Sequence, residues 1–67
     1  MKISYNNLWK LMIDKGLNKS ELREITRIGT NTLAKLSKNQ PVSMEVLMKV
    51  CEKLDCDLTD VCEFIKE

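Results

Sequence analysis

Apolar residues recur at helical spacing in short blocks along this 67-residue chain. The first block predicts a helix over about residues 6–15, with Asn6 or Asn7 as its cap. Gly16 ends this helix, because glycine adopts the left-handed conformation without steric cost. The apolar face of the helix consists of Leu8, Leu11, Met12 and Trp9.

Two further blocks, residues 18–25 and 30–37, predict a pair of short helices separated by a tight turn over residues 26–29. Asn18 and Glu21 form a capping-box pair, in which each side chain can bind an exposed backbone N–H group. Ile28 is the expected apolar plug of the turn, and Gly29 is a modest cap for the following helix. The residues expected to face the core are Leu22, Ile25, Leu33 and Leu36.

The last third of the chain predicts two more helices. Ser43 caps one over residues 44–54, and Asp57 caps a fifth, whose apolar face would contain Leu58, Val61, Cys62 and Ile65. Residues 1–5 alternate and predict a short extended arm or a small strand, although one strand alone cannot make a sheet. We therefore predict a single all-α domain of five helices.

Charge is distributed unevenly along the chain. The net charge is only +1, but residues 1–40 hold eight Lys or Arg and three acids, while residues 41–67 hold three lysines and seven acids. The halves therefore carry +5 and −4. Such polarity suits a protein that presents one face to phosphates and another to solvent or to a protein. Chance clustering of surface charge is the competing explanation.

Composition argues against several other classes of protein. No apolar run approaches the roughly 20 residues of a membrane helix, and residues 1–10 lack the features of a signal peptide, so we expect a cytoplasmic protein that does not bind membranes. The three cysteines, Cys51, Cys56 and Cys62, fit core positions better than metal or redox roles, since the chain has no histidine. Without a glycine-rich phosphate loop or an activated nucleophile, we predict neither an enzyme nor a cofactor.

From Leu8 to Ile65 the chain resembles the Cro/repressor-type helix-turn-helix family, also called the XRE family. The residues that carry the resemblance are Leu17, Glu21, Leu22, Ile28, Thr32, Leu33, Lys35, Leu36, Pro41 and Leu47, at uninterrupted spacing. The resemblance implies a five-helix, lambda-repressor-like DNA-binding domain. Its helix-turn-helix proper would span about residues 18–37.

The chain departs from the family pattern at four positions. Arg27 stands where the family prefers a turn glycine, so a left-handed backbone there would cost roughly 1 kcal/mol. Asn18 replaces a threonine cap, which is a neutral exchange. Lys19 replaces a glutamine that holds a phosphate in relatives, and a lysine can do this as a point charge. Asn39 replaces a loop glycine and tolerates the same backbone conformation.

The resemblance also implies site residues, because it places the third helix in the major groove of double-stranded DNA. The base-contacting candidates are Thr30, Asn31, Thr32 and Lys35. Asn31 is the strongest, since asparagine can bind adenine through two hydrogen bonds. The phosphate-contacting candidates are Lys19, Arg23, Arg27 and Lys38. The competing interpretations are a polar helix start for the first set and solvated surface charges for the second.

We therefore predict a sequence-specific DNA-binding transcriptional regulator. The alternative is a protein-interaction module on the same fold, such as an antitoxin-like or anti-repressor partner. One helix-turn-helix reads few base pairs, so we also expect a weak homodimer, and RNA polymerase or another regulator as a further partner. The aromatic residues Tyr5, Trp9 and Phe64 suit core or edge packing, with a dimer interface as their alternative role.

Overall fold

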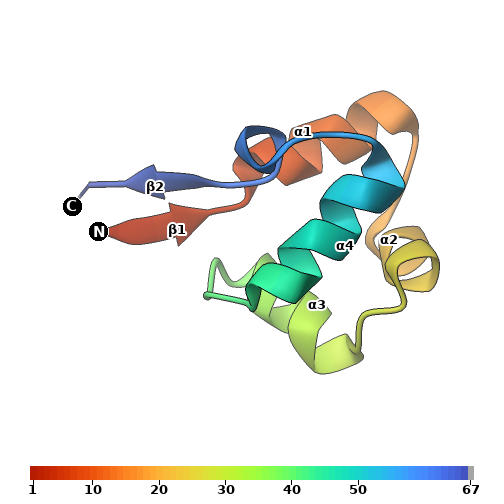
Figure 1. Cartoon of the computed structure of the whole chain (residues 1–67), viewed down its shortest axis with the longest axis horizontal. Coiled ribbons are helices and arrows are strands. Elements are labelled where there is room, and N and C mark those ends of the chain that lie inside the picture. Colours follow the sequence, from red (N-terminus) through yellow and green to blue (C-terminus); the bar gives the residue numbers. More distant parts are fainter. Residues whose placement is uncertain (67) are drawn as a thin grey trace.

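The computed structural model describes residues 1–66 and contains four α-helices, a 3-10 helix and two short strands in that part of the chain. The order is β1 (Lys2–Ser4), α1 (Asn6–Lys15), α2 (Lys19–Thr26), α3 (Thr30–Ser37), α4 (Met44–Leu54), η1 (Leu58–Asp60) and β2 (Glu63–Ile65). In Figure 1, α4 lies in the middle, with α1 above it, α3 below it and α2 at the side. The two strands form one end of the long axis.

The core is formed by side chains from every α-helix and from the segments that join them. Leu8, Leu22, Leu36 and Val50 are fully buried, and each comes from a different helix. The remaining buried apolar residues are Tyr5, Met12, Ile28, Leu47, Leu54 and Val61. This interior fixes which faces of α2 and α3 remain outside.

The ends of the helices agree with most of the predicted caps. Gly16 ends α1 in the left-handed conformation, and Ser43 caps α4 through a 3.3 Å hydrogen bond from the Val46 N–H to its Oγ. Asn18 and Glu21 form the complete capping box of α2, at 2.8 and 3.1 Å. At α1 the prediction was wrong: the cap is Tyr5, and the Asn6 N–H donates to Ser4 Oγ instead.

The predicted fifth helix is wrong. After Asp57 the chain makes only the 3-10 helix η1 and then the strand β2, which pairs antiparallel with β1 and sets Ile3 opposite Phe64. Of the apolar face expected for that helix, Val61 is buried, Cys62 is half-buried, and Leu58 and Ile65 are exposed. The N-terminal arm is thus one strand of a two-stranded sheet, because β2 supplies the hydrogen bonds that one strand lacks.

The prediction that Ile25 faces the core was also wrong. It is 38% exposed on α2, whereas the adjacent Thr26 is buried. The Thr26 hydroxyl is satisfied there, because it donates a 2.6 Å hydrogen bond to the Leu22 carbonyl oxygen. Within residues 1–66, no helix has the length and apolar character needed to cross a lipid bilayer.

Candidate nucleic-acid interface

The turn between α2 and α3 determines how α3 is presented. Arg27 ends α2 in the left-handed conformation, with φ 57°, as expected if the usual glycine conformation is kept. Ile28 then points into the core and is only 6% exposed. Gly29 precedes α3 in an extended conformation, and no side chain caps the helix start. The first turn of α3 therefore has backbone N–H groups without a side-chain partner.

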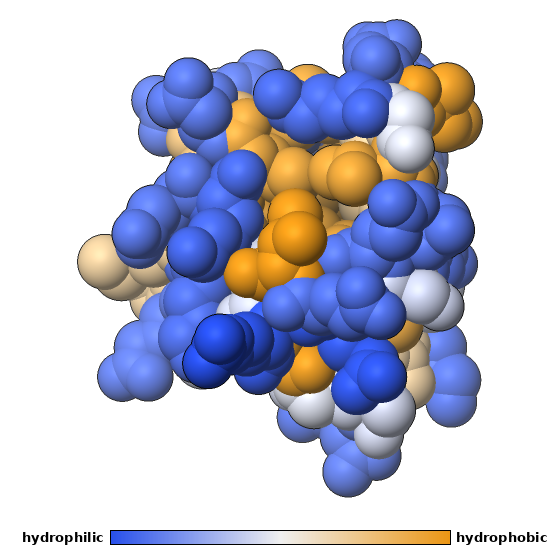
Figure 2. Space-filling view, turned by 90° about the vertical axis from the view of Figure 1, so that its right-hand side faces the viewer, coloured by the Kyte–Doolittle hydropathy of each residue, from blue (hydrophilic) through white to orange (hydrophobic). Residues whose placement is uncertain are grey.

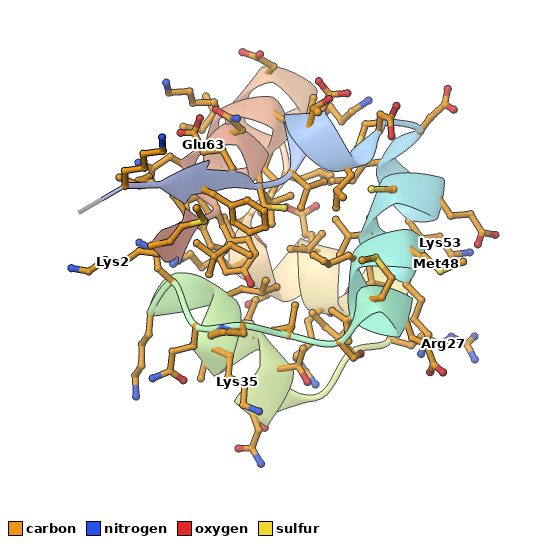
Figure 3. The ribbon with its side chains drawn as sticks, turned by 60° about the vertical axis from the view of Figure 1, so that its left-hand side comes forward. Lys2, Arg27, Lys35, Met48, Lys53 and Glu63 are labelled. Carbon is orange, nitrogen blue, oxygen red and sulfur yellow. The ribbon has the colours of Figure 1, made fainter. Side chains whose placement is uncertain are left out.

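The predicted base-contacting residues lie on α3, and most of them are exposed. Thr30, Asn31 and Lys35 are exposed, whereas Thr32 is half-buried. Asn31 and Lys35 are four residues apart and hence share one helix face, while Leu36 fills the core from the opposite side. Figure 3 shows Lys35 projecting from α3 away from the body of the molecule.

The predicted phosphate-contacting residues are all exposed but do not form one cluster. Lys19, Arg23 and Arg27 follow α2 at four-residue spacing, and Lys38 is the C-cap of α3. In Figure 3, Arg27 projects from a different edge of the molecule than Lys35. The structure thus brings Lys19 near the end of α3 and leaves Arg27 apart from Lys35.

Lys19 is the cation whose surroundings are best defined. Its Nζ donates a 3.1 Å hydrogen bond to Ser37 Oγ at the end of α3. The same Nζ lies 4.6 Å from the centroid of the Trp9 ring on α1. Neither partner was predicted from the sequence, because both contacts depend on how three helices pack.

The loop that follows α3 is tied to the start of α1. Asn39 is left-handed, with φ 54°, and its Oδ1 accepts a 3.2 Å hydrogen bond from the Tyr5 N–H. The Tyr5 hydroxyl donates to the Gln40 carbonyl oxygen at 2.7 Å. These contacts fix the segment beside Lys38. The left-handed conformation of Asn39 was predicted, but its partner was not.

Three cysteines form a separate cluster where α4 meets the C-terminal segment. All three are free and half-buried. Burial, together with the charge of the neighbouring Cys51 and a hydrogen bond with it, raises the pKa of Cys56 to about 11. Burial and Cys51 also raise the pKa of Cys62. Among residues 1–66, no group of three His, Cys, Asp or Glu side chains is arranged to hold a metal ion.

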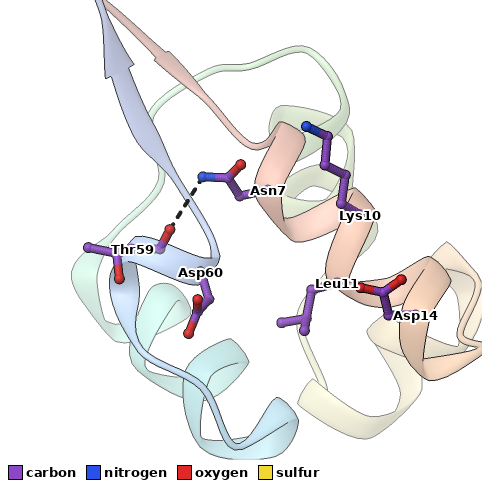
Figure 4. A pocket seen from close by; sticks show the side chains of 6 residues that line it. All are labelled: Asn7, Lys10, Leu11, Asp14, Thr59 and Asp60. Atoms are coloured by element: carbon purple, nitrogen blue, oxygen red, sulfur yellow. Dashed lines mark hydrogen bonds between the residues drawn. The ribbon is translucent and has the colours of Figure 1, made fainter.

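A polar hollow of about 260 Å³ lies between α1 and η1. Its walls include Lys10, Asp14 and Asp60, and the Asn7 amide donates a 3.3 Å hydrogen bond across it to the Thr59 carbonyl oxygen (Figure 4). This bond holds η1 against α1. The hydrogen bond across the hollow therefore helps to close the fold. None of the residues that line the hollow belongs to the candidate interface.

The sequence matches the Cro/C1-type HTH DNA-binding domain family over residues 7–67, and the chain belongs to this family. Among solved structures, it is similar to the transcriptional regulator VanUg, with a TM-score of 0.96 and 48% sequence identity. That match covers 98% of this chain and 88% of the VanUg chain. A search of curated proteins found no match. The family and the geometry of α2 and α3 together define a helix-turn-helix DNA-binding domain.

Proposed function

We propose that this protein is a sequence-specific transcriptional regulator that inserts α3 into the major groove of double-stranded DNA. The observation that carries the proposal is the shared outer face of Asn31 and Lys35 on α3, in a chain of the Cro/C1-type family. Asn31 reads adenine, and Lys35 reaches guanine O6 and N7. The 48% identity with a transcriptional regulator supports the same role for this chain.

The surrounding cations provide affinity and register without sequence information. Lys19, Arg23, Arg27 and Lys38 are exposed on the two helices and at their ends. Each phosphate contact releases counterions, so affinity for any duplex falls as salt concentration rises. In this proposal Lys19 and Lys38 contact the backbone close to α3, and Arg27 contacts it farther away.

The proposal is tested by selecting bound duplexes from a random pool with the purified chain. We expect enrichment of one short motif, with affinity that decreases steeply as salt is added. Recovery of no motif, together with the absence of salt-dependent binding to any duplex, would exclude the proposal.

We further propose that the functional unit is a weak homodimer joined at the end that contains the sheet. Phe64 on β2 is 72% exposed and hence does not pack in the core, whereas Tyr5 is buried and Trp9 is half-buried. Beside Phe64 lies a hollow of about 390 Å³, lined partly by Leu58 and Cys62. A twofold axis would place each phenyl ring against the partner's hollow, as a self-complementary interface requires.

The dimensions of the molecule support this arrangement. The domain measures 32 Å along its longest axis, and α3 lies near the middle of that axis, away from the strands (Figure 1). Two copies joined at the sheet would place their α3 helices on opposite sides of the joint. In this arrangement the two helices would enter successive major grooves on one side of DNA, which lie roughly 34–36 Å apart.

A protein-interaction role is the second candidate function, and one surface favours it. The side of the molecule where α2 lies, on the right in Figure 1, has apolar side chains in its middle, with polar side chains around them (Figure 2). Exposed apolar residues on α2 and α4 are Ile25, Met44 and Met48. A regulator could present this face to RNA polymerase or another regulator while α3 is bound to DNA. A module of this second kind would lack salt-dependent DNA binding, which separates the two candidates.

A further inference from the structure

One ammonium group joins three helices at the start of α2. Lys19 Nζ contacts the Trp9 ring of α1 and the Ser37 hydroxyl of α3, at 4.6 and 3.1 Å. Trp9 is half-buried, whereas Lys19 and Ser37 are exposed. The packed indole therefore gives the lysine a fixed support, and the charge stays at the surface beside Ser37, the residue that precedes Lys38.

We propose that Trp9 and Ser37 are positioning residues that hold the Lys19 ammonium in place for a DNA phosphate. The inference rests on the proposed function, since it requires that α3 enters the major groove. A lysine side chain is long and flexible, and it loses conformational freedom when it is fixed in a complex. Two contacts that fix it in the free protein reduce that loss at the moment of binding.

The chemistry of the two partners suits this role because neither is charged. The indole face attracts the cation through its quadrupole, and the Ser37 hydroxyl accepts only one of the three ammonium N–H donors. Within residues 1–66, no carboxylate pairs with Lys19. The full positive charge and two donors thus remain available to a phosphate, and the positive end of the α2 dipole adds to the local potential.

A purely structural staple between helices is the competing explanation, and it makes a different prediction. In that case, loss of Trp9 or Ser37 would lower the free energy of unfolding but leave the DNA affinity of the folded protein unchanged. A positioning role instead couples both residues to Lys19 in the binding free energy.

The test uses anisotropy titrations with the duplex selected by the wild-type chain and with a scrambled duplex. Ser37→Ala and Trp9→Leu should each weaken binding to both duplexes by about two- to fivefold. They should leave the salt dependence unchanged, because the cation is still present. Lys19→Ala should reduce the slope of log K against log salt by about one, and Ser37→Ala should then cost nothing more. Lys49→Ala, an exposed lysine change on α4, is the matched control and should retain wild-type affinity.

Thermal melting establishes that each variant is folded, and Ser37→Ala changes an exposed side chain, so it remains informative if Trp9→Leu does not fold. Wild-type affinity in the folded Ser37→Ala protein would overturn the positioning role. An equal loss from Ser37→Ala in the presence and absence of Lys19 would also overturn it. Failure of the wild-type chain to bind either duplex would instead refute the proposed function, so the two failures are distinguishable.

Discussion

The phenolic hydroxyl of Tyr5 donates a 2.7 Å hydrogen bond to the backbone carbonyl oxygen of Gln40, across 35 residues of sequence. Tyr5 is fully buried, and its own N–H donates to Asn39. One residue between β1 and α1 thereby anchors the loop that connects α3 to α4. The position of the C-terminal end of α3 depends on this contact.

Tyr5→Phe removes the hydroxyl and keeps the ring, so we expect the free energy of unfolding to fall by about 1 kcal/mol. Urea unfolding followed by circular dichroism measures the change.

From the burial of Tyr5 we also expect a loss of stability at alkaline pH. Burial is the main cause that raises the pKa of Tyr5 above its ordinary value of 10.0, so the fold favours the protonated phenol.

The stabilisation from the neutral phenol is therefore complete below pH 10.0 and is lost as pH rises through the raised pKa of the folded state. Phenolate absorbance follows the titration directly, because Tyr5 is the only tyrosine. Tyr5→Phe should lack this part of the alkaline decline. A decline of the same size in both proteins would contradict the assignment to Tyr5.

Arg27→Gly should raise the free energy of unfolding by about 0.5–1 kcal/mol, because glycine adopts the left-handed conformation at φ 57° without steric cost. The same change should weaken binding to every duplex, since it removes a cation. Asn39→Gly is the matched control, with φ 54°. It should destabilise the protein, because the hydrogen bond from Tyr5 is lost. A loss of stability in Arg27→Gly would refute this account of Arg27, and equal stabilisation by both changes would refute the role of the Asn39 hydrogen bond.

Asn31→Ala should cost about 1–3 kcal/mol of binding free energy on the selected duplex and little on a scrambled one, because a base contact is lost. Lys38→Ala should weaken both duplexes alike, as expected for a phosphate contact. Parallel binding titrations at one salt concentration measure both. Equal losses for Asn31→Ala on the two duplexes would remove this residue from base recognition.

The Cys56 thiol should react slowly with iodoacetamide at neutral pH. With its pKa raised to about 11 from 9.0, mainly by burial, the thiolate fraction is about a hundredfold smaller than in an unfolded chain. The neutral thiol stabilises the fold fully below pH 9.0, and this contribution is lost as pH rises through about 11. Mass mapping of alkylated peptides across pH, with the urea-unfolded chain as reference, measures the rate. A rate equal to that of the unfolded chain would contradict the shift.

Phe64→Glu should abolish the homodimer, because the phenyl ring would be replaced by a charge that cannot be buried in the partner's hollow. Met48→Glu is the matched control, since Met48 is 63% exposed on α4, away from the strands. Sedimentation with and without an inverted-repeat duplex measures the assembly state. A wild-type chain that remains monomeric at high concentration on that duplex would refute the dimer.

Local chemistry in the sequence was sufficient to predict the helix-turn-helix itself. The capping box of Asn18 and Glu21 defines the start of α2, and Ser43 defines the start of α4, because a cap depends only on residues three positions apart. The exposure of Asn31 and Lys35 also follows from the helical period. Which of the candidate residues contact DNA stays a prediction.

The C-terminal segment could not be predicted in the same way. Leu58, Val61, Cys62 and Ile65 have the spacing of an amphipathic helix, yet β2 forms because β1 lies beside it. A strand of three residues has too few positions to show a two-residue period, and its partner lies some sixty residues away in the sequence. The contact of Lys19 with Trp9 was missed for a similar reason, since it depends on packing between helices.

The pairing of β1 with β2 sets Lys2 opposite Ile65, so both ends of the described chain emerge at one corner of the molecule (Figure 1). An affinity tag fused at either end would extend from that corner and leave α3 unobstructed. A bulky fusion partner there would crowd the strands instead. A bulky fusion at this corner could therefore keep the protein monomeric without any substitution in the domain itself.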